Sequence, residues 1–392
     1  MTEDVFITAA RRTPIGGFQG VLSAVPAAQL GVAAVRAVLA DSKIPADRIS
    51  EVILGCVLQA GVGQGPARQA ALGGGIPASV PTATINKLCG SGMKAIMLGY
   101  DQIRADSAAV VLAGGLESMS NAPYLLLKAR QGYRMGHDKV YDHMFYDALL
   151  SPFDDKLMGN YADATAEKYG FTREQQDAYA TQSVERALAA CESGAFAKEI
   201  TPVDVTDRKG VRSVSRDETP YTCDIAKIPS LRPAFSKTGT VTAASSSSIS
   251  DGAAAVMLMS GTTLREHHAV PMARIVAHAS HAQAPEWFTT APVTAIKSVL
   301  ARAGWRAADV DLFEINEAFA CVTMAAMHDV DLDHAKVNVN GGACALGHPV
   351  GATGARLVTT LIYALAARRL KRGVAALCIG GGEATAIALE LV

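Results

Sequence analysis

Residues 82–100 read TATINKLCGSGMKAIMLGY, an apolar and β-branched run that passes through glycines into a helical pattern. The pattern predicts a strand over 82–88, a turn at 89–92 and a helix after it. Cys89 is therefore expected where a strand ends and a helix begins. The helix dipole is expected to lower the pKa of this thiol, and the glycines let a substrate approach closely. We interpret Cys89 as a nucleophile; the alternative is a core cysteine before a turn.

A second glycine-rich segment, residues 338–354, reads NVNGGACALGHPVGATG and also runs from a predicted strand into a helix. Its histidine, His348, precedes Pro349, a residue suited to the first turn of a helix. Because a helix N-terminus disfavours a charged imidazole, we expect His348 to be neutral. A neutral imidazole accepts a proton or donates a hydrogen bond to a developing oxyanion. The alternative is a histidine that only caps a glycine turn.

Two shorter segments also follow predicted strands. CIGGGE at 378–383 places Cys378 before Gly380, and backbone amides in such a glycine run are free of side chains and can form an oxyanion hole. NEAFA at 316–320 places the amide side chain of Asn316 at a strand tip. Each segment alone is weak evidence for a site.

Apolar β-rich runs alternate with helical patterns near both ends of the chain, which is typical of a layered α/β architecture. The expected strands are 5–9, 52–58, 80–88, 108–113, 312–315, 336–340 and 375–379. The two ends also resemble each other. ADRISEVILG at 46–55 matches ADVDLFEIN at 308–316 with a one-residue gap, and LAGGLE at 112–117 matches CIGGGE. This repeat predicts two related halves with a crevice between equivalent strand ends.

The composition changes between the halves, and the middle of the chain looks like an inserted domain. We divide the chain into an N-terminal half (1–118), an inserted loop domain (119–249) and a C-terminal half (250–392). Within the insertion, Thr172 predicts the start of a helix that runs to Ser193, because it is a good N-cap and Gly194 follows the other end. The serine run 245–248 is interpreted as a tight loop.

Charge and apolar content exclude several classes of protein. The 36 basic and 37 acidic residues nearly cancel without a long run of one sign, so no nucleic-acid or membrane-surface partner is expected. The longest apolar stretches are too short to cross a bilayer. Residues 1–7 lack the features of a secretory or transit segment, so we expect a cytoplasmic protein. The seven scattered cysteines contain no C-x-x-C pair, which argues against structural zinc and a disulfide framework.

Taken together, the four segments resemble the thiolase family over essentially the whole chain. The matching motifs are Asn86-x-x-Cys89-x-Ser91-Gly92, Asn316-Glu317-Ala318-Phe319, Gly347-His348-Pro349-x-Gly351 and Cys378-x-Gly380-Gly381-Gly382. The resemblance implies duplicated α/β halves in an α-β-α-β-α layering with an inserted loop domain. It also implies a two-step acyl transfer through an acyl-thioester on Cys89, which passes the acyl group to the α-carbon of a second acyl-CoA.

The resemblance implies a role for each motif. His348 activates the Cys89 thiol and, with a water held by Asn316, stabilises the enolate oxygen. Cys378 removes the α-proton, and the amides of Cys89 and Gly380 hold the tetrahedral oxyanion. A cysteine at this third position argues against the related ketoacyl synthases, which use two histidines. No metal or cofactor is expected, because coenzyme A is a substrate and product.

The family's pantetheine tunnel predicts further residues that contact coenzyme A or the acyl group. These are Met158, Phe235, Ala243, Ser247, Ile249, Phe288 and Phe319. Three positions depart from the short-chain pattern: Leu157 stands where a histidine is common, Phe288 where many relatives have methionine, and Ser245 where an asparagine is usual. Leu157 cannot supply a hydrogen bond, so the polarity near the acyl end differs from that pattern.

Residues 59–69 resemble thiolases that form acetoacetyl-CoA, so we expect reversible condensation of two acetyl-CoA to acetoacetyl-CoA and CoA. The alternative within the family is a 3-oxoacyl-CoA thiolase of fatty-acid or aromatic-acid (β-ketoadipyl-like) breakdown. Outside it stand a non-catalytic acyl-CoA-binding protein and an NAD-dependent oxidoreductase; residues 61–66 break the G-x-G-x-x-G spacing of the latter. Relatives are dimers or tetramers, and 131–147 is a candidate tetramer contact.

Overall fold

A large mixed β-sheet organises the chain, described in a computed structural model for residues 3–207 and 210–392. Residues 1 and 2 of the predicted N-terminal half lie outside this description. Ten strands form the sheet, in the order β12-β13-β14-β11-β1-β10-β5-β3-β4, with β2 paired to β10. Every residue of β5 and of β10 is buried, because helices cover both faces of the sheet there.

The elements follow one another in three groups. The first contains β1 (Val5–Arg12), β2 (Gly16–Gly17), α1 (Ala27–Ser42), η1 (Ala46–Arg48), β3 (Glu51–Gly55), α2 (Pro66–Gly73), β4 (Thr82–Ile85), α3 (Ser91–Arg104) and β5 (Val110–Ser118). The second contains β6 (Tyr124–Leu125), β7 (Tyr141–Asp142), a π turn η3 (Phe145–Leu149), α4 (Met158–Tyr169), α5 (Arg173–Glu192), β8 (Val203–Asp207), β9 (Gly210–Val214) and α6 (Thr219–Thr222). The third contains β10 (Ser250–Ser260), α7 (Gly261–Glu266), β11 (Ala273–Ala282), α8 (Ala291–Ala303), η6 (Ala307–Asp309), β12 (Leu312–Ile315), α9 (Ala320–Val330), α10 (Ala343–Leu346), α11 (Thr353–Arg368), β13 (Arg372–Ile379) and β14 (Glu383–Leu391).

The strand pairings confirm the predicted duplication. β3 pairs in parallel with β5, which pairs antiparallel with β10, which pairs antiparallel with β1. In the same way β12 pairs in parallel with β13, and β13, β14 and β11 follow in antiparallel order. β1 and β11 join the two sets through three residue pairs, Val5–Ile7 with Ala273–Ile275.

Details of the predicted repeat and strands differ from the structure. The match of 46–55 with 308–316 holds, since both segments form a 3₁₀ turn followed by a parallel strand. The match of 112–117 with 378–383 is wrong, because the first lies inside β5 whereas 380–382 turn between β13 and β14. Residues 336–340 make a single bridge, Phe313–Val337, instead of a strand. β10, assigned above to the C-terminal half, pairs with β1 and β5 of the N-terminal half.

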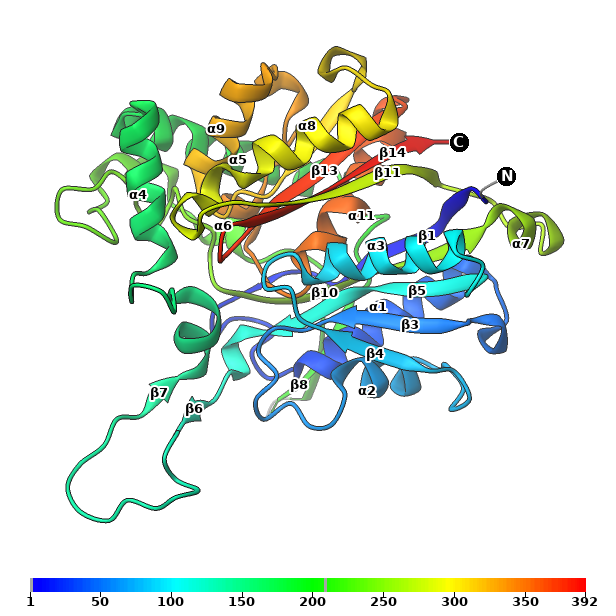
Figure 1. The fold of residues 1–392 in the computed structure, drawn as a ribbon, viewed down its shortest axis with the longest axis horizontal. Coiled ribbons are helices and arrows are strands. Elements are labelled where there is room, and N and C mark those ends of the chain that lie inside the picture. The colour runs from blue at the N-terminus through cyan, green and yellow to red at the C-terminus, as the bar shows by residue number, and fades with distance from the viewer. Residues whose placement is uncertain (1–2, 208–209) are drawn as a thin grey trace.

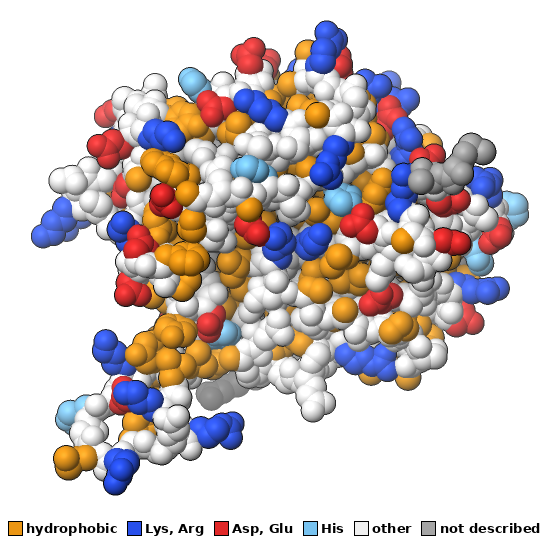
Figure 2. Space-filling model, viewed as in Figure 1, with side chains coloured by type: hydrophobic (Ala, Val, Ile, Leu, Met, Phe, Trp, Pro, Cys, Tyr) orange, Lys and Arg blue, Asp and Glu red, His pale blue; other side chains and the backbone are white. Residues whose placement is uncertain are grey.

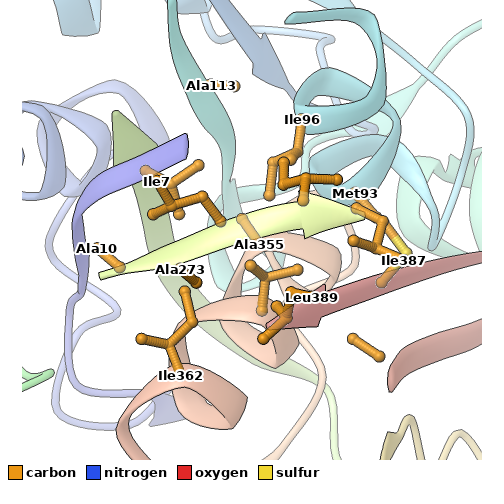
Figure 3. Close-up of a cluster of buried hydrophobic side chains, with 14 of the residues drawn as sticks. Ile7, Ala10, Met93, Ile96, Ala113, Ala273, Ala355, Ile362, Ile387 and Leu389 are labelled. Carbon is orange, nitrogen blue, oxygen red and sulfur yellow. The ribbon is translucent and has the colours of Figure 1, made fainter. Parts of the chain in front are cut away.

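The layers follow the expected α-β-α-β-α order. Figure 1 shows α8 over the β11–β14 layer, α3 and α11 between the two layers of strands, and α1 and α2 on the far side of β3–β5. α11 contacts both β13 and β10, as a central helix must. Figure 3 shows apolar side chains gathered around these central helices, among them Ile7, Ile96 and Leu389. Each such buried aliphatic side chain stabilises the fold by roughly 1.5–3 kcal/mol.

The two central helices cross closely at glycines near their N-termini. A Cβ atom on Gly92 of α3 would lie 2.9 Å from the backbone nitrogen of Ala355, and one on Gly354 of α11 would lie 2.3 Å from that of Met93. No residue larger than glycine fits at this crossing. It brings together the loops that precede the two helices, which carry Cys89 and His348.

The middle of the chain contains the predicted helix. α5 begins after Thr172, whose side chain accepts from the backbone nitrogen of Gln175, and it ends before Ser193. The serine run is a tight loop, as predicted: Ser245 is buried and accepts from the backbone nitrogen of Thr242 at 2.9 Å. The hairpin β6–β7 projects from the body (Figure 1). Among the described residues, no helix is long and apolar enough to span a bilayer.

Candidate active site

Cys89, His348 and Gly380 line one cavity of about 350 Å³. Six of the seven predicted contact residues line the same cavity, namely Met158, Phe235, Ser247, Ile249, Phe288 and Phe319. The seventh, Ala243, is exposed and is not among the lining residues. A larger hollow of about 990 Å³ lies over α4, but none of the predicted catalytic residues lines it. The sequence-predicted site therefore assembles from segments that are far apart in the chain.

Cys89 follows a strained residue. Leu88 has a φ of 49°, in the left-handed region that a leucine rarely adopts. Two side chains hold it there: Asn86 accepts from the Leu88 nitrogen at 2.8 Å, and the Ser91 hydroxyl donates to the Leu88 carbonyl at 2.6 Å. This turn explains why the predicted strand ends at Ile85, earlier than expected.

The environment of the Cys89 sulfur differs from the sequence expectation. Burial raises the pKa of the Cys89 thiol to about 11, although hydrogen bonds from the backbone N–H of Gly380 and from its own N–H oppose the rise. The predicted lowering of this pKa is therefore wrong in the free site, because desolvation outweighs the helix end. Gly380 also lines the cavity beside Cys89, where an oxyanion-hole donor is needed.

His348 lies in the loop between α10 and α11, five residues before the first residue of the helix that it was expected to open. Its Nδ1 lies 2.6 Å from the Thr353 hydroxyl, and that hydroxyl donates to the Pro349 carbonyl at 2.9 Å. The Thr353 oxygen must then accept from Nδ1–H, which leaves the lone pair on Nε2. Burial and, to a smaller extent, the positive charge of Arg356 lower the pKa of His348 to about 3. The imidazole is thus neutral, as expected, and Nε2 is a proton acceptor.

Asn316 and Cys378 lie behind the cavity wall. Both are fully buried, and neither is among the residues that line the cavity. The Asn316 Nδ2 atom lies 3.5 Å from His348 Nε2, and among the described residues its Oδ1 atom has no hydrogen-bond partner. Cys378 ends β13. Burial raises its pKa well above the ordinary value, and the nearby Cys89 raises it further. Two thiols, an imidazole and an amide therefore lie in one region of the fold.

Sequence reasoning missed part of the wall. Phe145, Ala148 and Leu149 of the π turn line the cavity, as does Val350. Leu157, which was expected near the acyl end, also lines it. The three turn residues are spaced i, i+3, i+4, the spacing of one apolar helix face, and this signal could have found them. π turns are frequent at functional sites.

A cysteine that shares a cavity with a backbone amide and with a neutral imidazole whose Nε2 can accept a proton, and that lies next to a second thiol, is a site for acyl transfer through a thioester. The sequence profile of the thiolase N-terminal domain matches residues 5–262, and that of the thiolase C-terminal domain matches residues 269–391. The chain belongs to the thiolase family and is an acyltransferase.

Similar proteins share almost the full length of the chain. An acetyl-CoA acetyltransferase of Pseudomonas aeruginosa is 48% identical over 389 residues, which cover 99% of each chain. Acetyl-CoA acetyltransferase 2 of Arabidopsis thaliana is 49% identical over 392 residues, covering 99% of this chain and 97% of the relative. The crystal structure of the acetyl-CoA acetyltransferase of Bacillus anthracis superposes with a TM-score of 0.97 at 40% identity, covering 100% of this chain and 99% of that one.

Proposed function

We propose that this protein is an acetyl-CoA C-acetyltransferase, which reversibly condenses two acetyl-CoA to acetoacetyl-CoA and CoA. The observation that carries the proposal is one mainly apolar cavity lined by Cys89, His348 and Gly380, in which the His348 lone pair lies on Nε2. The names of relatives 45–49% identical over nearly the whole chain support the same activity.

In the first half-reaction, Nε2 of His348 takes the proton of Cys89 as the thiolate attacks the carbonyl carbon of acetyl-CoA. The N–H groups of Cys89 and Gly380 stabilise the tetrahedral oxyanion. The carbon–sulfur bond to CoA then breaks, the proton passes from His348 to the departing CoA thiolate, and an acetyl-thioester remains on Cys89. Exchange of one thioester for another is nearly isoenergetic, so both directions stay accessible.

In the second half-reaction, Nε2 of His348 takes the proton of the Cys378 thiol, and the Cys378 thiolate removes the α-proton of a second acetyl-CoA. The enolate oxygen is stabilised by the Nε2–H of the protonated His348 and by a water bound to Asn316, whose buried Oδ1 lacks a protein partner among the described residues. The enolate carbon attacks the acetyl carbon on Cys89, the bond from that carbon to the Cys89 sulfur breaks, and the Cys89 thiolate takes the proton from His348. In the cleavage direction Cys378 returns the proton. We propose that coenzyme A is the only non-protein group needed, as substrate and product.

The deciding experiment compares CoA-dependent cleavage of acetoacetyl-CoA with that of 3-oxooctanoyl-CoA. We expect kcat/KM to favour acetoacetyl-CoA by about tenfold or more, which is roughly 1.4 kcal/mol of transition-state discrimination. The opposite preference would move the protein to the degradative branch of the family without changing the roles of Cys89, His348 and Cys378.

The second candidate function is cleavage of longer 3-oxoacyl-CoA. A cavity of about 510 Å³ adjoins the active-site cavity and shares Ala148, Met158 and Gly380 with it. Leu157 makes the intervening wall apolar where a histidine is common in short-chain relatives. Asp147 and Asp155 line the second cavity, so it suits a neutral chain better than a carboxylated one.

We also propose a cytoplasmic homotetramer, with a dimer as the alternative. The support for assembly is the projecting segment 122–142, which exposes large apolar side chains. Tyr124 is 69% exposed, Met135 97% and Val140 58%. Figure 2 shows hydrophobic side chains gathered where this arm joins the body. Exposed apolar surface of this kind is typical of contacts between subunits, and light scattering that shows a stable monomer would refute the proposal.

A further inference from the structure

Glu117, near the end of β5, is a fully buried carboxylate that the mechanism above does not use. It accepts three backbone N–H groups: from Val57 at 2.9 Å, from Gly351 at 3.0 Å and from Leu58 at 3.1 Å. The Cys56 thiol also donates to it, at 3.7 Å. One side chain therefore satisfies amides from two loops that are almost 300 residues apart in the sequence.

The first of these loops, 56–58 after β3, supports the turn that carries Cys89. The carbonyl of Val57 accepts from the side chain of Asn86 at 3.4 Å. The same Asn86 side chain accepts from the backbone of Leu88, whose left-handed conformation sets the position of the next residue, Cys89. The contact of Glu117 with Val57 therefore reaches the nucleophile in three steps.

The second loop, 349–351, supports His348. Its Pro349 carbonyl accepts from the Thr353 hydroxyl, which in turn accepts from the imidazole. Gly351 packs directly on the carboxylate: a Cβ atom there would lie 2.7 Å from Glu117 Oε2, and one on Gly115 would lie 2.0 Å from the Gly351 carbonyl. This joint leaves no room for either loop to shift without the other.

We propose that Glu117 is a positioning residue, whose ionised carboxylate fixes the distance between Cys89 and His348 by clamping the two loops that carry them. The inference rests on the proposed function in that His348 takes the proton of Cys89. Glu117 makes no hydrogen bond to either of the two side chains, and it acts on their positions through backbone contacts.

The electrostatics of the clamp fit this role. Burial raises the pKa of Glu117 to about 7, and the three amides and the Cys56 thiol oppose the rise. The ionisable groups that face it are Cys56 and Cys89. Burial is the largest cause of the raised pKa of both thiols, and the charge of Glu117 also raises both. Asp251 on the adjacent strand β10 is directed instead to Ser118 and to the Ser120 nitrogen. Loss of the Glu117 charge therefore makes the Cys89 thiol easier to ionise while it loosens the geometry.

The test uses Glu117→Gln and two rates for Cys89. One is acetylation by acetyl-CoA, followed by rapid quench and mass spectrometry, which needs His348 in place. The other is alkylation by iodoacetamide at pH 8, which needs no acyl-CoA and no partner residue. We expect acetylation to slow by at least about tenfold, whereas alkylation is unchanged or faster. A matched control is Glu218→Gln, since Glu218 also accepts two backbone N–H groups, from Gly17 and Val21, and should change neither rate.

Acetylation within about twofold of the unchanged enzyme, or both rates falling together, would overturn the inference. Glu117→Asp retains the charge but is one methylene shorter. It should therefore lose its contact with one of the two loops and slow acetylation as well. If neither variant folds by circular dichroism, the unchanged enzyme decides: acetylation should slow as pH falls through about 7, and a flat profile between about pH 5.5 and 8.5 refutes the clamp. Absence of any acetylation refutes the proposed function instead. In that case the alkylation rates alone test the effect of Glu117 on Cys89.

Discussion

The Nδ1 atom of His348 lies 2.6 Å from the Thr353 hydroxyl, which donates its own hydrogen bond to the Pro349 carbonyl. The hydroxyl therefore selects the tautomer in which Nε2 can accept the Cys89 proton. We expect Thr353→Val to lower kcat for acetoacetyl-CoA cleavage by on the order of tenfold to a hundredfold with little change in KM. Thr359→Val is the matched control, because Thr359 lies in the same helix and donates only within it. Equal activity of the two variants would show that the tautomer is not selected this way.

The pH dependence of Cys89 alkylation tests its buried environment. Thiolate forms as pH rises through the pKa, and burial raises that pKa to about 11. We therefore expect the rate with iodoacetamide to rise about tenfold per pH unit between about pH 8 and 11. An ordinary exposed cysteine would level off near its pKa of about 8.5. A plateau below pH 9 would mean that the thiol is activated before substrate binds.

Replacement of each thiol should separate the roles of Cys89 and Cys378 in the two half-reactions. Cys89→Ala should abolish both acetylation and carbon–carbon bond cleavage while CoA binding survives, which also distinguishes an enzyme from an acyl-CoA-binding protein. Cys378→Ala should still become acetylated on Cys89, whereas condensation falls by roughly 10²- to 10⁴-fold, because only the second half-reaction needs the α-proton removed. Mass spectrometry of the intact protein after mixing with acetyl-CoA provides the measurement. An unacetylated Cys378→Ala enzyme would contradict this division.

Substitution of Met158 tests whether the acyl chain can pass from the active-site cavity into the adjoining one. Its sulfur lies over Gly380, where an added Cβ atom would be 3.4 Å away. We expect Met158→Ala to raise the ratio of kcat/KM for 3-oxooctanoyl-CoA over acetoacetyl-CoA by about tenfold, roughly 1.4 kcal/mol. Met327→Ala serves as the control, since this half-buried methionine of α9 lines neither cavity. An unchanged ratio would show that the second cavity does not receive the acyl chain.

The helix crossing predicts a stability defect. Gly354→Ala places a Cβ atom 2.3 Å from the Met93 nitrogen, so α3 and α11 must move apart. We expect a loss of about 1–3 kcal/mol in the free energy of unfolding, measured in urea, together with slower catalysis because Cys89 and His348 precede these helices. Gly17→Ala meets its nearest neighbours at 3.6 Å and should cost little. A destabilisation equal to that of Gly17→Ala would argue against the close crossing.

The parts of the site that the sequence predicted are those with local signals. Cys89, His348, Cys378 and Asn316 each follow a strand-like run in a recognisable motif, and the structure brings them together. The capping residue Thr172 likewise fixes the start of α5 from its own neighbours alone. Such features depend on chain segments of ten residues or so and are visible in a single sequence.

The features that the sequence did not predict depend on distant contacts. Glu117 reads as an ordinary strand residue until Val57 and Gly351 are placed beside it. The raised pKa of Cys89 is another case. The helix end, which was expected to lower this pKa, is visible in the local sequence, whereas the burial that raises it comes from the whole fold. The family resemblance predicted that Ala243 contacts coenzyme A or the acyl group, whereas in the structure Ala243 is exposed and does not line the cavity.

The strand β1 pairs with β10 on one side and with β11 on the other, so a single strand joins the two halves of the sheet. The reacting groups lie in loops and at a strand end supported by this shared framework, whereas Leu149, Met158 and Phe235 of the cavity wall come from the middle of the chain. Mutations in that middle segment can alter which acyl chain enters without disturbing the atoms that react. Substrate range and chemistry are therefore free to evolve separately within this one polypeptide.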